Sequence, residues 1–303
     1  MGWKGRDVVS SSEIGRKEIE EILKEAEKLE HVAKKKGRTT ELQGKILASL
    51  FYEPSTRTQM SFSVAMQRLG GEVTGFSNPK SSSVVKGESL SDTIKAVEPA
   101  ADAIVIRHPS EGAARLAADA TEVPVINAGD GNNQHPTQAL LDVYTIKKNK
   151  KKVDGLTVLM AGDLKYGRTV HSLSYALANF DDVTLQYYSP QQLRMPQHIL
   201  ADLRDSVKVE ELHKFDVGKA DVIYATRIQK ERIADAEEYA KAAYVIDSET
   251  MAGAKKDAML MHPLPRVDEI ATEVDADPRA KYFEQEANGI PVRMALLKLI
   301  LKG

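Results

Sequence analysis

The chain alternates between short apolar runs, which suit β-strands, and longer segments with apolar residues at helical spacing. Strands are predicted at residues 45–51, 73–77, 103–107 and 123–127, and then at 156–161, 183–188, 221–225, 244–246 and 258–261. Helices are predicted at 19–33, 56–69, 88–97, 111–118, 135–148, 168–178 and 287–301. Strands that alternate with helices usually pair in parallel, with the helices on the sheet faces. The sequence therefore predicts an α/β chain of two domains, each a mainly parallel sheet flanked by helices.

A basic stretch at 147–152 interrupts the alternation near the middle of the 303 residues, a length that accommodates two domains. We interpret this stretch as a solvated helix end or linker, because runs of like charge stay in water. It marks the expected domain boundary. We predict a first domain at 1–134, a connecting helix at 135–149 and a second domain at 150–286.

Charge and composition exclude several classes of function. The 42 basic and 44 acidic side chains give a net charge of −2, so any anion site must be a local cluster of cations. The absence of cysteine excludes disulfides, thiolate catalysis and cysteine-based metal sites within this chain. No apolar run is long enough to span a bilayer, and the N-terminus lacks the apolar core of a signal peptide. We expect a cytoplasmic protein that needs no metal or cofactor and binds neither nucleic acid nor membranes.

A cluster of hydroxyls and one cation, Ser55, Thr56, Arg57 and Thr58, follows the strand at 45–51 where a helix is predicted to begin. Free backbone N–H groups at a helix N-terminus, hydroxyl donors and a forked guanidinium together suit a phosphate dianion. Taken alone, the cluster is equally typical of a helix N-cap beside a solvent-exposed arginine.

Other candidate side chains also follow predicted strands. Arg107 ends an apolar strand, and Arg168 and Arg227 come after strands of the second half. His135 and Gln138 lie three residues apart, so they project from nearly the same helix face and can donate hydrogen bonds to one small ligand. Because ligands of parallel sheets bind beyond the carboxyl ends of strands, these side chains are candidates for a binding site. Ion pairs at the rim of a sheet and a histidine N-cap are the structural alternatives.

Two loops carry further candidates. Lys86 lies in a serine-rich loop at 77–87 and matters for binding only if this loop folds over a cleft, in its own subunit or a neighbour. The segment 261–266 contains two prolines, which fix the backbone dihedral angles. Carbonyl groups held in this way can accept hydrogen bonds from the NH₂ group of a ligand.

The segment Gly162–Thr169 supports an alternative function, because it differs by one residue from a nucleotide-binding P-loop. Arg168 replaces the expected lysine, Asp163 places an anion inside the loop, and no strand-ending magnesium-binding aspartate is evident. A nucleotide triphosphatase therefore remains an alternative, as does a binding protein without catalysis.

Together these segments resemble the aspartate/ornithine carbamoyltransferase family, from about residue 11 to residue 301. The motifs that carry the resemblance are Phe51-Tyr52-Glu53-Pro54-Ser55-Thr56-Arg57-Thr58, Lys86-Gly87-Glu88, Arg107-His108-Pro109, His135-Pro136-Thr137-Gln138, Gly162-Asp163-Leu164-Lys165-Tyr166-Gly167-Arg168, Thr226-Arg227-Ile228-Gln229 and His262-Pro263-Leu264-Pro265-Arg266. Within the family, the ornithine type typically carries cysteine in place of Thr137, and Arg168 with Arg227 suits the two carboxylates of aspartate. The resemblance implies a first domain that binds carbamoyl phosphate, a second that binds aspartate, and a last helix at 287–303 that packs on the first domain.

The resemblance further implies transfer of the carbamoyl group from carbamoyl phosphate to the amine of L-aspartate, an early step of pyrimidine (UMP) biosynthesis. For carbamoyl phosphate, it assigns Ser55, Thr56, Arg57, Thr58, Arg107 and Lys86 to the phosphate, and Thr58, Arg107 and His135 to the carbonyl oxygen. It assigns Gln138, Leu264 and Pro265 to the NH₂ group of the same substrate. For aspartate, it assigns Lys86, Arg168, Arg227 and Gln229. It also implies a homotrimer with shared active sites, in which Ser82 and Lys86 come from the neighbouring subunit. In some members, zinc-containing regulatory chains join a larger assembly.

Overall fold

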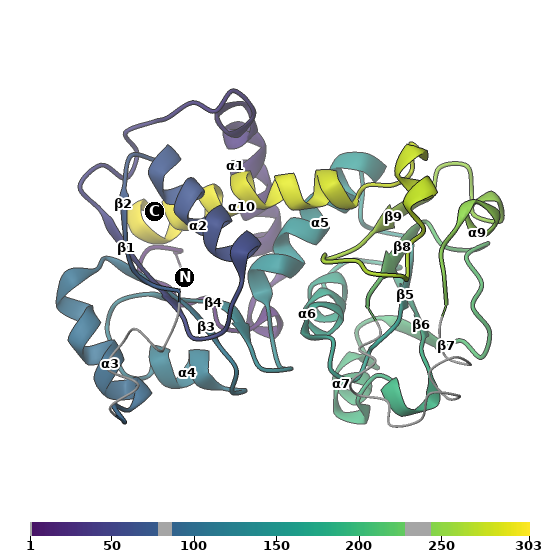
Figure 1. Ribbon diagram of the computed structural model, residues 1–303, viewed down its shortest axis with the longest axis horizontal. Coiled ribbons are helices and arrows are strands. Elements are labelled where there is room, and N and C mark those ends of the chain that lie inside the picture. The colour runs from purple at the N-terminus through teal and green to yellow at the C-terminus, as the bar shows by residue number, and fades with distance from the viewer. Residues whose placement is uncertain (1, 78–86, 228–243) are drawn as a thin grey trace. The chain divides into compact units, whose positions relative to one another are not determined.

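The structure is a computed structural model that describes residues 2–77, 87–227 and 244–303 (Figure 1). It forms two compact units, one made of Met1–Leu141 with Asn288–Gly303 and the other of Asp142–Ala287. Two helices, α5 (Pro136–Lys150) and α10 (Tyr282–Lys302), carry the chain from one unit to the other. The first unit is therefore discontinuous in sequence. In the described ranges, no helix is both long and apolar enough to cross a membrane.

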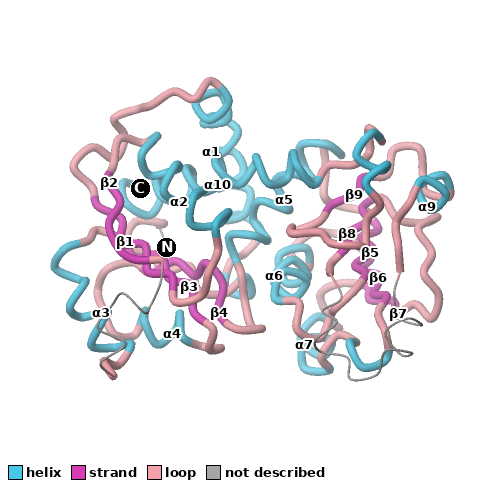
Figure 2. Tube along the Cα trace, viewed as in Figure 1, coloured by secondary structure: helices cyan, strands magenta, loops and turns pink. Residues whose placement is uncertain are grey.

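The first unit is built around a parallel sheet with the strand order β2-β1-β3-β4. Its strands are β1 (Ile46–Phe51), β2 (Glu72–Phe76), β3 (Ala103–His108) and β4 (Val125–Asp130), and its helices are α1 (Arg16–Lys34), α2 (Thr56–Arg68), α3 (Leu90–Val97) and α4 (Ala113–Ala118). Figure 2 shows α3 and α4 on one face of this sheet and α1, α2 and the end of α10 on the other. Apolar residues of α3 and α4 pack against alternate residues of β1 and β3, such as Leu50 and Ile104. Residues two apart along a strand lie on the same face of the sheet, so these apolar residues form the face that α3 and α4 cover.

The second unit has a parallel sheet with the strand order β7-β6-β5-β8-β9. Its strands are β5 (Thr157–Ala161), β6 (Thr184–Tyr188), β7 (Lys208–Glu211), β8 (Val222–Ala225) and β9 (Met259–Met261), and its further helices are α6 (Arg168–Leu177), α7 (Gln197–Leu203) and α9 (Ser248–Ala252). Strands β5, β8 and β9 are almost completely buried. Fully apolar strands of this kind are typical of parallel sheets that are covered on both faces.

Helix α10 binds the end of the chain into the first unit. Arg293 is 2% exposed, donates to Ser61 Oγ at 2.7 Å and lies over the ring of Phe62, both on α2. Lys298 lies 2.9 Å from a carboxylate oxygen of Glu25 on α1 and 3.2 Å from one of Glu41. Figure 1 shows this yellow end of the helix among the purple and blue helices of the first unit.

The fold class predicted from the sequence is confirmed, and most predicted strands and helices are present. The strand predicted at 244–246 is wrong, because only Ile246 makes an isolated bridge, to Ile270. Strand β7 was not predicted because its sequence, Lys-Val-Glu-Glu, has little apolar character at an edge that pairs on one side only. Helix α10 begins at Tyr282, before the predicted start at 287, and runs through Pro291.

The basic stretch that suggested a boundary is the last turn of α5 and the residues after it. Lys148 lies 3.1 Å from Glu284, and Lys150 lies 2.9 Å from Asp257 and is buried along its side chain. These two lysines hold the end of α5 within the second unit, so this part of the stretch is tied down by ion pairs and is not a solvated linker.

Candidate active site

The strand order places the candidate residues of the first unit at one edge of its sheet. The chain runs from β1 to β2 on one side and then returns to place β3 on the other side of β1. The crevice beyond the carboxyl ends of two such strands is the usual ligand site of an open parallel sheet. Ser55–Thr58 follows β1, and Arg107 is the second-last residue of β3, directly opposite Phe51 in the register.

Helix α2 begins directly after this cluster. Ser55 is its N-cap residue with extended backbone dihedral angles, but its side chain makes no capping hydrogen bond. Thr56 and Arg57 are exposed in the first turn, whereas Thr58 is 7% exposed. The first-turn N–H groups of this helix, which have no partners within the helix, are therefore not capped by the side chain that precedes them.

Arg107 connects three segments of the same edge. Its backbone carbonyl accepts a hydrogen bond from the Tyr52 N–H at 2.8 Å. Its guanidinium donates to the Ala128 carbonyl at 3.3 Å and lies 3.1 Å from a carboxylate oxygen of Glu53. No local pattern in the sequence indicates this contact between Glu53 and Arg107. The arginine is thus held in place between the loop after β1 and the end of β4.

A buried carboxylate organises the turn that presents His135. Asp130 is 1% exposed, and its Oδ1 accepts hydrogen bonds from the Asn127 side chain at 2.8 Å and the Gln134 N–H at 3.1 Å. Its Oδ2 accepts from the Gly112 N–H at 2.8 Å and the Asn133 side chain at 3.0 Å. The run Asp130-Gly131-Asn132-Asn133 is typical of a turn, but no local pattern indicates that Asp130 accepts hydrogen bonds from four donors.

His135 and Gln138 are buried at the start of α5, with 3% and 6% of their surface exposed. The Gln138 N–H donates to the His135 carbonyl at 3.0 Å, so the two residues share the first turn as their spacing predicted. They lie in the same unit as Arg107 and Ser55–Thr58, after the strand next to β3.

The second unit has the same kind of edge, between β5 and β8. Arg168 is the first residue of α6, after β5, and Arg227 follows β8 with one residue between. The two loops touch at Gly162, which has a φ of +121°, because an added Cβ would lie 2.3 Å from the Thr226 carbonyl oxygen. The Tyr244 hydroxyl lies 2.8 Å from the carbonyl oxygens of both Ala161 and Thr226. Burial raises the pKa of Tyr244 far above its ordinary value, so this hydroxyl remains a donor.

The loop between β5 and α6 does not have the chemistry of a nucleotide-binding P-loop. Asp163 is 2% exposed and accepts a hydrogen bond from the Tyr166 N–H at 2.9 Å. A P-loop uses such backbone N–H groups to bind phosphate, and a buried carboxylate among them repels a phosphate group. This geometry favours a loop that positions Arg168 and argues against a nucleotide triphosphatase.

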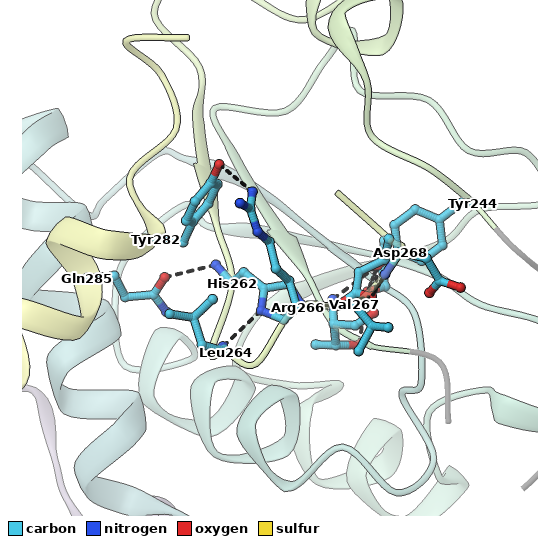
Figure 3. Close-up of polar contacts among 11 residues, drawn as sticks. Tyr244, His262, Leu264, Arg266, Val267, Asp268, Tyr282 and Gln285 are labelled. Atoms are coloured by element: carbon cyan, nitrogen blue, oxygen red, sulfur yellow. Dashed lines mark hydrogen bonds and ion pairs between the residues drawn. The ribbon is translucent and has the colours of Figure 1, made fainter. Parts of the chain in front are cut away.

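A chain of hydrogen bonds holds the loop after β9, as Figure 3 shows in part. The His262 N–H donates to Gln285 Oε1 at 2.9 Å, and Gln285 Nε2 donates to Asp142 Oδ1 at 2.7 Å. The other oxygen of this fully buried carboxylate accepts from the Tyr224 hydroxyl at 2.8 Å. Burial and the nearby carboxylate raise the pKa of Tyr224 well above its ordinary value. The loop with Leu264 and Pro265 is therefore anchored to α5, β8 and α10.

Three of the candidate residues, Ser82, Lys86 and Gln229, lie outside the described residues. Their roles stay predictions. Within the described ranges, no group of three or more histidine, aspartate or glutamate side chains comes together as a metal site would require.

Comparison with known proteins identifies relatives over the whole chain. The family model for the carbamoyl-P binding domain of aspartate/ornithine carbamoyltransferase matches residues 6–148, and the model for the Asp/Orn binding domain matches residues 154–300. The aspartate carbamoyltransferase catalytic subunit of Thermococcus kodakarensis is 58% identical over 99% of this chain and 98% of its own length. That of Methanococcus maripaludis is 52% identical over 98% of both chains.

Solved structures agree with these sequence relatives. Aspartate transcarbamoylase from Trypanosoma cruzi, in complex with N-(phosphonacetyl)-L-aspartic acid, has a TM-score of 0.94 and 40% identity, over 99% of this chain and 97% of that one. The catalytic subunit of M. jannaschii aspartate transcarbamoylase has a TM-score of 0.89 and 54% identity, over 97% of both chains.

Proposed function

Because the chain belongs to the aspartate/ornithine carbamoyltransferase family, we propose that it transfers the carbamoyl group of carbamoyl phosphate to the amine of L-aspartate. The products are N-carbamoyl-L-aspartate and phosphate, and the reaction is an early step of de novo pyrimidine biosynthesis. One observation carries the choice of substrates. In each of the two sheets, cationic side chains lie at or just after the carboxyl ends of the two strands at which the strand order reverses, and both substrates are anions.

The first unit supplies the groups for the phosphate. A phosphate dianion at the start of α2 would accept hydrogen bonds from the first-turn N–H groups and from the hydroxyls of Ser55, Thr56 and Thr58. The guanidinium groups of Arg57 and Arg107 would offset its charge. The same segment holds a phosphate both before the reaction, as part of the substrate, and after it, as a product.

The carbonyl oxygen of the carbamoyl group gains negative charge when the amine attacks the carbon. We assign Thr58, Arg107 and His135 to donate hydrogen bonds to this oxygen, and each donor of this kind contributes about 10²–10³-fold in rate. Gln138 and the carbonyl groups of Leu264 and Pro265 orient the NH₂ group. The reaction needs no nucleophile from the protein, and the leaving phosphate accepts the proton of the amine.

The second unit supplies the groups for aspartate. Arg168 and Arg227 are both half-buried on loops that touch, which suits two forked cations that hold two carboxylates. Lys86 and Gln229 complete this set in our proposal. Ornithine carries an amine where aspartate carries its second carboxylate, so two arginines discriminate against it by charge.

The proposal extends to the assembly and the location of the protein. We propose a cytoplasmic homotrimer in which Ser82 and Lys86 of one subunit complete the active site of its neighbour. The relatives named as catalytic subunits support an assembly of more than one chain. A zinc-containing regulatory chain is the further partner that such an assembly would take.

The test of the activity is a colorimetric assay for carbamoylaspartate with the purified chain, carbamoyl phosphate and aspartate. We expect product with aspartate and none with ornithine. Turnover of ornithine alone would refute the assignment of the second substrate, and hydrolysis of ATP would support the nucleotide triphosphatase. Binding of both substrates without product would indicate a binding protein.

The test of the shared site is subunit exchange between two inactive variants, Lys86→Ala and Arg57→Ala. If the site combines residues of two subunits, some mixed trimers contain a fully wild-type site and activity returns. Verified exchange without recovery of activity contradicts the shared site, whatever the outcome of the substrate assay.

A further inference from the structure

His262 and Glu269 form a buried pair next to the loop that carries Leu264 and Pro265. They are 2% and 4% exposed, and His262 Nε2 lies 2.6 Å from Glu269 Oε1. His262 Nδ1 accepts a hydrogen bond from the Leu264 N–H at 2.8 Å. An accepting Nδ1 carries no proton, so the proton of the neutral ring is on Nε2 and is donated to Glu269.

The pair holds the loop on both sides of Leu264-Pro265. The ring of His262 binds the N–H of Leu264, as Figure 3 shows. The second oxygen of Glu269 accepts hydrogen bonds from the N–H groups of Val267 at 3.1 Å and Asp268 at 3.2 Å. Two short loop segments, one before and one after the proline, are thus tied to the same hydrogen-bonded pair.

The loop needs such support because Leu264 has a φ of +49°. This left-handed conformation is unfavourable for a residue with a Cβ and persists only where the surroundings impose it. Burial alone would raise the pKa of Glu269, but the hydrogen bonds from His262 and the Val267 N–H outweigh it and hold that pKa below its ordinary value. The carboxylate therefore stays ionised and acts as an acceptor on both oxygens.

We propose that His262 and Glu269 are positioning residues that fix the direction of the Leu264 and Pro265 carbonyls, and thereby select a substrate with an NH₂ group beside its carbonyl. This inference rests on the proposed function, in which these carbonyls accept hydrogen bonds from carbamoyl phosphate. The pair itself does not contact the substrate. It acts through the dihedral angles of the loop.

The test compares two stable probes that differ only in the group to be recognised. Phosphonoacetamide carries NH₂, and acetonylphosphonate carries CH₃ at the same position. The ratio of their dissociation constants, measured by calorimetric titration of the wild-type assembly, reports the hydrogen bonds to the NH₂ group. A purely structural role would change thermal stability or both affinities together, whereas a positioning role changes the ratio.

Two substitutions separate the two hydrogen bonds of the ring. His262→Asn keeps an acceptor near the position of Nδ1, and His262→Gln keeps a donor near that of Nε2. We expect the preference for phosphonoacetamide to fall about tenfold in His262→Gln, which loses the bond to Leu264, and to be largely retained in His262→Asn. Glu269→Gln replaces one acceptor oxygen by an NH₂ group, which faces either the His262 ring or the N–H groups of Val267 and Asp268. It should therefore also lower the preference for phosphonoacetamide.

His171→Gln is the matched control, because His171 is also a buried histidine of the second unit and its Nε2 binds the Leu164 carbonyl at 2.7 Å. It should leave the ratio unchanged. An unchanged ratio in folded His262→Gln and Glu269→Gln overturns the positioning role. Failure of the wild type to bind phosphonoacetamide or to form carbamoylaspartate overturns the proposed function instead.

Discussion

Gly162→Ala tests whether the loops after β5 and β8 must touch for aspartate to be held. An added Cβ would lie 2.3 Å from the Thr226 carbonyl oxygen and 2.4 Å from its Oγ1, and real Cβ atoms essentially never approach closer than 3.0 Å. Moving that oxygen from 2.3 to 3.0 Å requires a shift of about 0.7 Å. Arg227 is the next residue, so the shift alters its position relative to Arg168.

The expected loss of stability in Gly162→Ala has two parts. A residue with a Cβ at a φ of +121° costs about 1–3 kcal/mol, and overpacking adds about 1–3 kcal/mol. We expect the free energy of unfolding to fall by about 2–6 kcal/mol, which lowers the Tm of a unit of this size by about 4–24 °C. A displacement approaching 1 Å at a substrate-positioning group lowers kcat/KM for aspartate by about 10–100-fold.

Gly155→Ala is the control in the same unit. Gly155 also has a positive φ, +71°, but an added Cβ would meet only the flexible end of Lys152, at 3.6 Å. It lies before β5, at the opposite end of the strand from Gly162. Thermal unfolding and steady-state kinetics in both substrates are the measurements. If Gly162→Ala matched Gly155→Ala in Tm and in kcat/KM for aspartate, the contact between the loops would have no functional role.

Three further predictions concern other parts of the chain. Asp130→Asn replaces an acceptor oxygen by a donor among four N–H groups, so we expect a loss of about 2–4 kcal/mol in urea unfolding and a lower kcat, because the turn before His135 loosens. Arg227→Lys keeps the charge but not the fork, so KM for aspartate should rise at least about tenfold while binding of phosphonoacetamide stays within about twofold; a parallel loss of both would contradict separate roles. Burial alone would raise the pKa of Glu25, but Lys28 and Lys298 hold it below its ordinary value, so the stability from this pairing is full above the ordinary pKa and is lost as the pH falls through the lowered one. Lys298→Met should therefore flatten the decrease in unfolding free energy between about pH 5 and pH 3, and an unchanged profile would refute the assignment.

The sequence predicts those parts of the candidate site that depend on local order along the chain. Ser55–Thr58 directly follows an apolar strand and begins a helix, and both features are visible in the residues themselves. Likewise, Arg107 is the second-last residue of a strand that begins with four buried apolar residues, and His135 follows the next strand after a short turn. These predictions need only the spacing of apolar residues, which is two in strands and 3.6 in helices, and the polar residues at strand ends.

Contacts between distant residues could not be predicted in this way. The reversal of strand order between β1 and β3 depends on which strands pair, and no local period reports pairing. The contact of Glu53 with Arg107 and the four donors around Asp130 depend on that order. Strand β7 escaped prediction for a different reason, since an edge strand with charged residues lacks the apolar pattern of its neighbours.

The discontinuity of the first unit determines when that unit can fold during synthesis. Its last segment, Asn288–Gly303, leaves the ribosome only after all of Asp142–Ala287. At about 5–20 residues per second, the nascent first unit waits on the order of 10–30 s for the end of α10, on which Val292, Leu296 and Arg293 are buried. During this interval α2, whose first turn follows the phosphate cluster, lacks the arginine that binds Ser61. The second unit, which is continuous, can therefore fold before the first is complete, and α2 gains the support of Arg293 only after the second unit has been translated.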